Sequence, residues 1–247
     1  MFSYQAPADL LKDRIILVTG AGDGIGREAA LQYAAHGATV VLLGKTQEKL
    51  DQVYDQIEAA GYPQAAIVPM NLDVATEHDY IELSNTLYQE FGRLDGILHN
   101  ASIIGVRTPI ENFDPVIWNQ VMQVNVNAPF LLTQTLMPLI MVSEDASIIF
   151  TTSSVGRKGK AYWGAYAVSK FATEGLMQVL ADEVENLPNI RVNAINPGAT
   201  RTNMRAFAYP GENPESIPAP KEIMPLYLYL MGPDSKDTQG QSLDAQG

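Results

Sequence analysis

Residues 15–26 read IILVTGAGDGIG, and this stretch decides the fold. The first five residues are apolar or β-branched, which is typical of a strand buried on both faces. A glycine-rich turn and a helical pattern over residues 27–36 follow. This order indicates a phosphate-binding loop, because glycine lets the backbone approach a pyrophosphate and the helix amides point toward it. The strict GxGxxG spacing is absent. The variant Gly24-x-Gly26-x-x-Ala29 is present, with Ala29 allowing close helix packing.

Outward from this stretch, apolar runs and helical patterns alternate. We expect strands at 38–43, 65–69, 94–99, 146–152, 190–195 and 241–243, and helices at 47–60, 76–91, 115–142, 162–186 and 222–231. The alternation predicts an α/β fold: a doubly wound, Rossmann-like parallel sheet of about seven strands with helices on both faces. We expect a single domain over residues 1–247. The proline-rich segment 201–220 interrupts the pattern and is predicted to be a substrate flap with at most short helices.

Charge and composition exclude several classes of function. The 247-residue chain is 46% hydrophobic and has a formal net charge of −12, which argues against nucleic acid or an anionic membrane as a partner. It contains no cysteine, so disulfides, thiolate nucleophiles and zinc–thiolate sites are excluded, and no metal site is predicted. The first residues lack the features of a secretory signal, and no apolar run approaches the length of a membrane span. We therefore expect a cytoplasmic protein.

Tyr166 and Lys170 are the candidate catalytic pair. In a predicted helix this spacing places both side chains on one face, one turn apart. A neighbouring ammonium favours the phenolate, but lowering the pKa of a tyrosine from about 10 to about 7 takes roughly 4 kcal/mol. A charge pair in bulk water gives about 1 kcal/mol, so the chemistry requires a sheltered cleft. The alternative is a surface Tyr–Lys pair on an ordinary amphipathic helix.

The end of the second expected strand bears on the choice between NADP and NAD. Enzymes that use NAD often place a carboxylate there for the ribose hydroxyls. This chain has Gly44 followed by Lys45, which favours NADP without excluding NAD. The alternative is that Lys45 is a solvated surface lysine. Asp73, at the end of the third strand, is placed to accept a hydrogen bond from the adenine amino group or to initiate the next helix. Asn100 and Ala101 are placed to line the cofactor.

These motifs together resemble the short-chain dehydrogenase/reductase family over nearly the whole chain. The matching pieces, in order, are Thr19-Gly20-x-x-x-Gly24-x-Gly26, Asp73-Val74, Asn100-Ala101, Asn125, Ser153, Tyr166-x-x-x-Lys170 and Pro197-Gly198 with Thr202. The sequences of residues 122–127 and 182–183 are similar to those of the bacterial YciK-type branch of the family. His99 and Ser102 depart from the family's Asn-Asn-Ala-Gly element, and Asp23 stands where many NADP-preferring relatives have a basic residue.

The resemblance implies a role for each matching residue. Tyr166 would be the acid/base that exchanges a proton with the substrate oxygen while the nicotinamide exchanges a hydride. Lys170 would lower the pKa of Tyr166 and hold the nicotinamide ribose, and Ser153 would orient the substrate. Asn125 would hold a water that connects Lys170 to solvent. The structural alternatives are a turn-capping serine and a buried asparagine beside Pro129. The expected cofactor contacts are Gly20, Asp23, Gly24, Ile25, Gly26, Lys45, Asp73, Val74, Asn100, Ala101, Tyr166, Lys170, Pro197, Gly198, Thr200 and Thr202.

The predicted function is that of an oxidoreductase that prefers NADP and interconverts a ketone or aldehyde and an alcohol. Its partners would be a small carbonyl or alcohol substrate and further copies of itself, in a homodimer or homotetramer built through the helices around 115–142 and 162–186. The alternative from another class is a non-catalytic nucleotide-binding regulator with the same fold. An intact Ser–Tyr–Lys–Asn set argues against that alternative, because a binding module has no need of a proton relay.

Overall fold

Within residues 1–246, the part of the chain that the computed structural model describes, seven parallel strands form one sheet. Their order is β3-β2-β1-β4-β5-β6-β7. The strands are β1 (Ile15–Thr19), β2 (Thr39–Gly44), β3 (Ala66–Pro69), β4 (Gly96–His99), β5 (Ala146–Thr151), β6 (Ile190–Asn196) and β7 (Ser242–Asp244). The predicted doubly wound parallel sheet is therefore confirmed.

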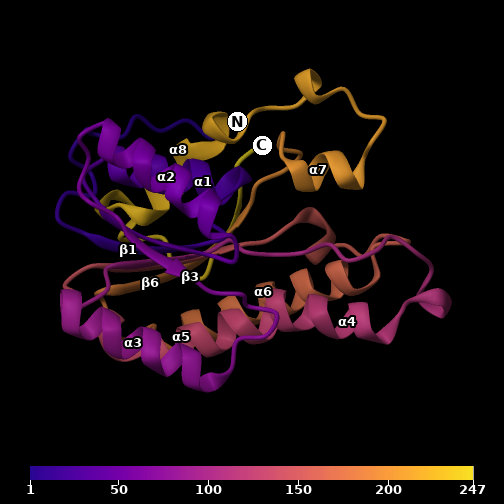
Figure 1. Ribbon diagram of the computed structural model, residues 1–247, viewed down its shortest axis with the longest axis horizontal. Helices are drawn as coiled ribbons and strands as arrows, with labels where there is room; N and C mark the ends of the chain where they lie inside the picture. The colour runs from indigo at the N-terminus through magenta and orange to yellow at the C-terminus, as the bar shows by residue number, and fades with distance from the viewer. Residues whose placement is uncertain (247) are drawn as a thin grey trace.

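Helices cover both faces of this sheet (Figure 1). One face carries α1 (Gly24–Ala35), α2 (Gln47–Ala59) and α8 (Met224–Met231). The other carries α3 (Glu77–Phe91), α4 (Pro115–Met122), α5 (Ala128–Ile140) and α6 (Gly164–Glu183). The remaining helix, α7 (Asn203–Ala208), stands apart from both layers, within segment 201–220. That segment also has a 3-10 turn at Pro214–Ser216, so it contains only short helices, as predicted.

The two layers enclose two apolar cores, and the alternation of side chains along β1 supplies both. Ile16 and Val18 pack on the side of α1, α2 and α8, whereas Ile15 and Leu17 pack on the side of α3, α5 and α6. All five residues of β1 are buried, as expected for the central strand of a parallel sheet. Burying one such side chain contributes about 1.5–3 kcal/mol.

The long helix expected over residues 115–142 is divided by a single π-helical turn at Gln123–Asn127. Pro129, just after this turn, has no N–H to donate to the carbonyl four residues earlier, which is that of Asn125. The hydrogen-bond ladder is instead shifted by one residue, with the Ala128 N–H donating to the Gln123 carbonyl. The proline therefore shifts the ladder rather than breaking the helix, and Asn125 lies at the centre of the irregular turn.

Two other helices show how local sequence sets their ends. α3 starts with a capping box between Thr76 and Asp79 and ends at Gly92 in the left-handed conformation (φ 72°), which agrees with the expected range of 76–91. α6 is shorter than expected at both ends and begins at Gly164. A Cβ at Gly164 would stand 2.5 Å from the Phe113 ring, so a residue with a side chain would not fit there.

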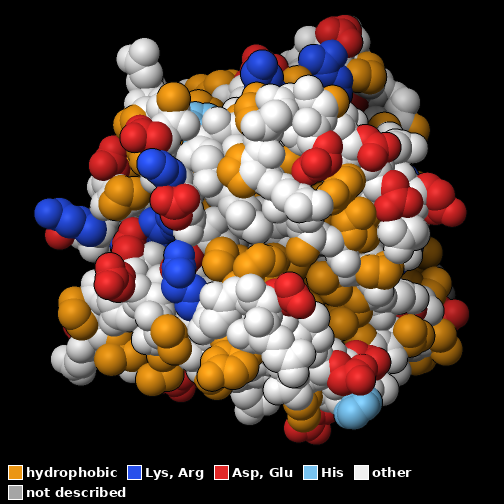
Figure 2. Space-filling view, turned by 60° about the vertical axis from the view of Figure 1, so that its left-hand side comes forward, with side chains coloured by type: hydrophobic (Ala, Val, Ile, Leu, Met, Phe, Trp, Pro, Cys, Tyr) orange, Lys and Arg blue, Asp and Glu red, His pale blue; other side chains and the backbone are white. Residues whose placement is uncertain are grey.

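Charged side chains are mixed on the face shown in Figure 2, where basic groups are interspersed with acidic ones and apolar side chains form a band across the middle. This face lacks the contiguous positive surface that a nucleic-acid backbone requires. No helix in residues 1–246 combines the length and the apolar character needed to cross a membrane. Over the same residues, no three His, Asp or Glu side chains are placed to hold a metal ion.

Candidate active site

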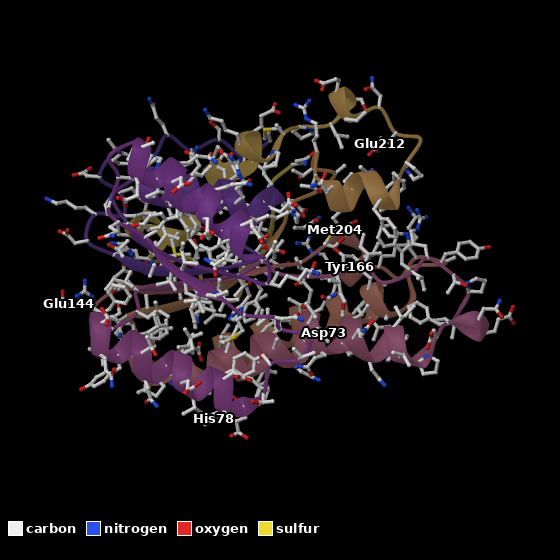
Figure 3. The ribbon with its side chains drawn as sticks, viewed as in Figure 1. Asp73, His78, Glu144, Tyr166, Met204 and Glu212 are labelled. Carbon is white, nitrogen blue, oxygen red and sulfur yellow. The ribbon has the colours of Figure 1, made fainter. Side chains whose placement is uncertain are left out.

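A cleft opens at the carboxyl ends of the strands, beside the point where the strand order reverses between β1 and β4. Its volume is about 430 Å³, within the range of small-molecule sites. Figure 3 shows Tyr166 and Met204 close together between α6 and α7, with Asp73 at the same end of the molecule and Glu144 at the opposite end. The cleft runs from the glycine-rich loop to Tyr166 and Lys170, so one cavity joins the two parts of the predicted site.

The glycine-rich stretch depends on two close contacts. The Thr19 hydroxyl accepts hydrogen bonds from the backbone N–H groups of Asn100 and the next residue (2.9 and 3.0 Å), which ties the end of β1 to the end of β4. At Gly26, a Cβ would stand 2.3 Å from the Gly20 carbonyl oxygen, so only glycine allows α1 to approach the loop. Gly26 thus makes a close contact that the pattern had not assigned to it, and Ala29, expected to allow close helix packing, is fully buried in the core.

Asp23 caps α1 and connects it to two other elements. Its carboxylate accepts from the Gly24 N–H (2.7 Å), so α1 begins at Gly24 rather than at Arg27. The same carboxylate pairs with the Lys49 ammonium of α2 (2.5 Å) and accepts from the Asn203 amide at the start of α7 (3.1 Å). Lys49 therefore balances the acidic charge of Asp23 beside the helix N-terminus.

Most of the predicted cofactor contacts line the cleft. They are Gly20, Asp23, Gly24, Ile25, Lys45, Asp73, Asn100, Ala101, Tyr166, Lys170, Pro197 and Thr202. Gly26, Val74, Gly198 and Thr200 are not among its lining residues, and Val74 is 70% exposed. Lining residues that were not among the expected cofactor contacts include Gly22, Lys49, Leu50, Met70, Asn71, Ser102, Ile103, Thr152, Asn203 and Met204.

The cleft suits a dinucleotide at both ends. At one end, Gly20 and Gly24 adopt positive φ (70° and 53°), which opens the loop backbone toward the N-terminus of α1. At the other, Thr152 lines the cleft, and its hydroxyl is buried without a hydrogen-bond partner within residues 1–246. An unpaired buried hydroxyl is costly, so a polar ligand at this position would stabilise the site.

Tyr166 and Lys170 lie one turn apart on α6, as predicted. The two residues are only 8% and 4% exposed, so the pair is sheltered rather than on the surface. The Lys170 Nζ lies 5.6 Å from the centre of the Tyr166 ring and donates a hydrogen bond to the Thr151 carbonyl (2.7 Å) at the end of β5. The shelter that the electrostatic argument required is therefore present.

The pKa of the phenol differs from the sequence expectation. Burial raises the pKa of Tyr166 to about 12, and a hydrogen bond with the Ser153 side chain opposes this rise. Burial lowers the pKa of Lys170 to about 8, while the carboxylate of Glu174 acts in the opposite direction. The sequence argument considered only the charge of the lysine and left out the desolvation of the phenol. In this structure Tyr166 holds its proton at neutral pH.

Asn125 and Ser153 support the pair in different ways. Ser153 precedes a 3-10 turn at Ser154–Gly156 and hydrogen-bonds with Tyr166. The Asn125 amide donates to the Ile103 carbonyl and the Ser169 hydroxyl, and its oxygen accepts from the Ile103 N–H, each at 2.9 Å. These contacts join the π-helical turn, the loop after β4 and α6. The side chain of Asn125 is thus committed to protein partners, and its role in a water relay stays a prediction.

Comparison with known proteins bears on what this site does. The sequence model for short chain dehydrogenases matches residues 14–213. The chain belongs to the short-chain dehydrogenase family. It is 55% identical over 245 residues to YciK, an uncharacterized oxidoreductase of Escherichia coli K12, covering 98% of this chain and 96% of the relative. The predicted resemblance to the YciK-type branch is therefore confirmed.

Solved structures of similar short-chain dehydrogenases have the same fold. One, from Pseudomonas syringae and assigned to the family as a candidate member, is 63% identical, covers all of both chains and superposes with a TM-score of 0.98. Another, from E. coli CFT073 and similarly assigned, was solved in complex with NADPH. It is 54% identical and covers 98% of this chain and all of its own, with a TM-score of 0.95.

In this short-chain dehydrogenase, the side chain of Gln246 holds the loop of residues 197–200. The Gln246 amide donates to the carbonyls of Pro197 and Ala199 (both 2.8 Å) and to the Thr200 hydroxyl (3.3 Å). Gly198 has φ 71°, and a Cβ there would stand 2.9 Å from the Gln246 side chain. Gly198 and Thr200 thus shape the loop behind Pro197, which itself faces the cleft.

His99 departs from the family pattern and is buried in the core beneath the cleft. Its ring stacks on Phe150 (4.7 Å between centres), and its Nε2 lies 2.9 Å from the Thr133 hydroxyl. Since that hydroxyl donates to the Pro129 carbonyl (2.7 Å), it accepts from His99, which places the ring proton on Nε2. Nδ1 is then a bare buried acceptor, without a partner in the described chain. Burial lowers the pKa of His99 to about 3.

His99 is therefore expected to make the fold sensitive to acid. An unfolded histidine titrates near 6.5, so between pH 6.5 and about 3 the unfolded chain binds a proton that the folded one does not. Stability falls with falling pH across this window, by up to about 1.4 kcal/mol per pH unit. His99→Asn removes this contribution. Urea unfolding from pH 7 to pH 4 should give a shallower decline for the variant, with His78→Asn at an exposed histidine as control. Parallel curves for wild type and His99→Asn would refute the assignment.

Proposed function

We propose that this protein is an NADP-dependent oxidoreductase that interconverts a ketone or aldehyde and an alcohol. The observation that carries the proposal is that the buried pair Tyr166–Lys170 lines the same cleft as the glycine-rich loop. A dinucleotide bound along this cleft with its phosphates at the N-terminus of α1 would reach the pair. The bound cofactor would supply or accept the hydride at the substrate carbon.

The residues of this chain would manage the proton. In the direction of reduction, the carbonyl oxygen gains negative charge as hydride reaches the carbon, and the Tyr166 hydroxyl transfers its proton to that oxygen to give the alcohol. The pKa of Tyr166, raised to about 12 by burial, keeps this proton in place until the transfer occurs. Ser153 would hold the carbonyl, and the Lys170 ammonium would stabilise the phenolate left behind. Asn125 would position the loop and α6 and hold the relay water.

Three further features are part of the proposal. Segment 201–220 would act as a flap over the substrate. It contains only short helices, of which α7 is the longest, and the Asn203 amide joins the segment to the cofactor loop. The whole chain would act as one domain in the cytoplasm. Exposed apolar side chains on α4, α5 and α6, among them Val116, Phe130 and Phe171, would lie in the interface of a homodimer or homotetramer. Light scattering that finds only monomers would exclude that assembly.

The preference for NADP rests on two lysines. Lys45 follows β2 and Lys49 lies in the first turn of α2, and both line the cleft where a ribose 2′-phosphate would stand. Because Asp23 is paired with Lys49, its negative charge is balanced and repels a 2′-phosphate less strongly. A relative of known structure, 54% identical, binds NADPH, which supports the same preference here.

Lys45→Ala is expected to weaken NADPH binding by on the order of tenfold, because a charge-assisted contact with phosphate contributes about 1.5–3 kcal/mol before solvent screening. NADH, which lacks the 2′-phosphate, is the internal control and should bind the variant and the wild type equally well. Both affinities can be measured by fluorescence titration at two salt concentrations. Tighter binding of NADH than of NADPH by the wild type would overturn the preference.

The reaction itself is tested by a panel of ketones, aldehydes and alcohols with both cofactors, followed by nicotinamide absorbance. Turnover of any member supports the proposed class of reaction. If the protein binds NADPH tightly and turns over none of a broad panel, the non-catalytic regulator of the same fold becomes the better description.

A further inference from the structure

An aromatic cluster adjoins the cleft at Tyr166, on the side away from the cofactor loop. Trp163 lies against Tyr166 (5.6 Å between ring centres) and against Tyr209 of segment 201–220 (5.9 Å). Met204 packs into the same cluster and also lines the cleft, as Figure 3 shows for Met204 beside Tyr166. The cluster therefore joins the Tyr166 end of the cleft to Tyr209, the residue that follows α7.

Two exposed cations lie on the aromatic pair of Trp163 and Tyr209. The Arg107 guanidinium, from the loop after β4, stands 4.9 Å from the centre of the Trp163 ring and 5.1 Å from that of Tyr209. The Lys160 ammonium, from the loop before α6, lies 5.9 and 5.6 Å from the same two rings. Both cations thus flank one aromatic pair, one ring away from Tyr166.

Neither cation has a carboxylate partner within residues 1–246. Arg107 donates to the Ala208 carbonyl, and Lys160 donates to the Tyr209 hydroxyl (3.1 Å). A third cation, Arg205, stacks on Tyr209 but is paired with Glu212 through two hydrogen bonds. Two unbalanced positive charges at one site are notable in a chain whose net charge is −12. A cation–π contact at an exposed site contributes about 0.5–1 kcal/mol. This attraction explains why one cation lies on the aromatic pair, but the second cation is repelled by the first.

A buried donor at the same place lacks an acceptor. The indole N–H of Trp163 is buried and has no hydrogen-bond partner in the described chain, although the residue is only 6% exposed. Leaving such a donor unpaired costs about 1–3 kcal/mol. An acceptor oxygen on a bound molecule would remove that cost and would also balance the two cations.

We propose that the substrate is a carbonyl compound with a remote anionic group, a carboxylate or a phosphate, bound by Arg107 and Lys160. This inference rests on the proposed function, because it places the carbonyl at Tyr166. The apolar part of the substrate lies along Met204 and Trp163, and the anion reaches the cations beyond them. Arg107 and Lys160 also hold α7 through Ala208 and Tyr209, so the anion binds where segment 201–220 is fastened to the rest of the protein.

The test compares charged and neutral forms of the same substrate with the NADPH-loaded enzyme. The probes are ω-oxo carboxylates of increasing chain length, their methyl esters and the corresponding ω-oxoalkyl phosphates. We expect kcat/KM of the wild type to be at least tenfold higher for one anionic series than for the esters. Carboxylate preferred over phosphate, or the reverse, identifies the group. Arg107→Gln and Lys160→Gln should each lower kcat/KM for the anionic probes by on the order of tenfold, mainly through KM.

Lys158→Gln is the matched control, because it removes an exposed positive charge from the same loop as Lys160 at a residue without a contact to the aromatic pair. It should leave all probes within about twofold of wild type. Rates for the methyl esters should fall much less than those for the anionic probes in Arg107→Gln and Lys160→Gln, since loss of the contacts to α7 affects both kinds of probe and loss of the charge only the anions. If Arg107→Gln and Lys160→Gln reduce ester and acid turnover equally, the cations only fasten α7, and the proposal is wrong. Equal wild-type kcat/KM for acids and esters would also overturn it.

A binding measurement separates this inference from the proposed reaction. If neither esters nor anions are reduced, the proposed reaction fails for these compounds, and binding alone then decides the anion site. In a Trp118→Phe background, Trp163 is the remaining tryptophan, so its fluorescence reports on the aromatic pair. Saturable quenching by the carboxylates or phosphates, lost in Arg107→Gln and Lys160→Gln, would support the site. No saturable change with any anion would refute it.

Discussion

Tyr166→Phe is expected to lower carbonyl reduction by about a thousandfold, within the range of 10² to 10⁴ that proton transfer by a positioned side chain contributes. The variant keeps the ring that packs against Trp163 and removes only the hydroxyl that carries the proton. Binding of NADPH should therefore stay within a few fold of wild type. Stopped-flow or steady-state rates with any active carbonyl compound, together with cofactor titration, measure both quantities.

Tyr88→Phe is the control for this substitution, because Tyr88 is 65% exposed on α3 and is not among the residues that line the cleft. Its rates should match the wild type. Full activity of Tyr166→Phe would contradict the assignment of Tyr166 as the proton donor. Loss of NADPH binding in Tyr166→Phe would instead indicate a disrupted site, and Ser153→Ala, which leaves the phenol in place, would then have to test the chemistry.

Gly26→Ala is expected to lower stability and NADPH affinity by more than its single added methyl group suggests. The new Cβ would stand 2.3 Å from the Gly20 carbonyl oxygen and 2.5 Å from the Asn100 amide, so α1 must move away from the loop. Overpacking of this kind costs about 1–3 kcal/mol of stability, or more where the backbone itself is the obstacle. We also expect NADPH affinity to fall by on the order of a hundredfold, since the N-terminus of α1 shifts.

Gly159→Ala makes the same chemical change with the opposite expected result. Gly159 is an exposed residue in the loop before α6, and a Cβ there meets no atom within 4 Å. Replacing a glycine by alanine at a compatible position of this kind is worth about 0.4–1 kcal/mol of added stability. Thermal unfolding of both variants and NADPH titration distinguish the two cases. Wild-type NADPH affinity and stability in Gly26→Ala would contradict this expectation and show that the loop can move to make room for the methyl group.

Most of the fold could be predicted from the sequence, because buried parallel strands are short apolar runs and helices carry their own caps. Gly92 and the Thr76 capping box set the ends of α3 close to the expected range of 76–91. The π-helical turn before Pro129 could not be predicted in this form. A proline in a helix can break it, kink it or shift its hydrogen bonds, and the packing of Asn125 against Ile103 and α6 decides between these outcomes.

The site was predicted less evenly than the fold. Tyr166, Lys170 and the glycine-rich loop carry local spacing signals, and the structure brings them to one cleft. Lys49 was missed, although its place in the first turn of the helix that follows Lys45 was a signal that could have found it. Gln246 had no such signal, because it reaches its loop only through the pairing of β7 with β6. The desolvation of the Tyr166 phenol had no such signal either, because it depends on the residues that pack against the ring.

The strand order has a consequence for how the chain acquires its structure. β1 pairs with β2, its neighbour in sequence, but also with β4, which is separated from it by two strands and three helices. Contacts of such long sequence separation must wait for costly loop closure, so high contact order should make folding slow. The unit β1-α1-β2-α2-β3 closes through neighbouring segments and can form first, leaving one edge of β1 unpaired until β4 arrives. Intermediates with that open edge are the species most exposed to aggregation during refolding.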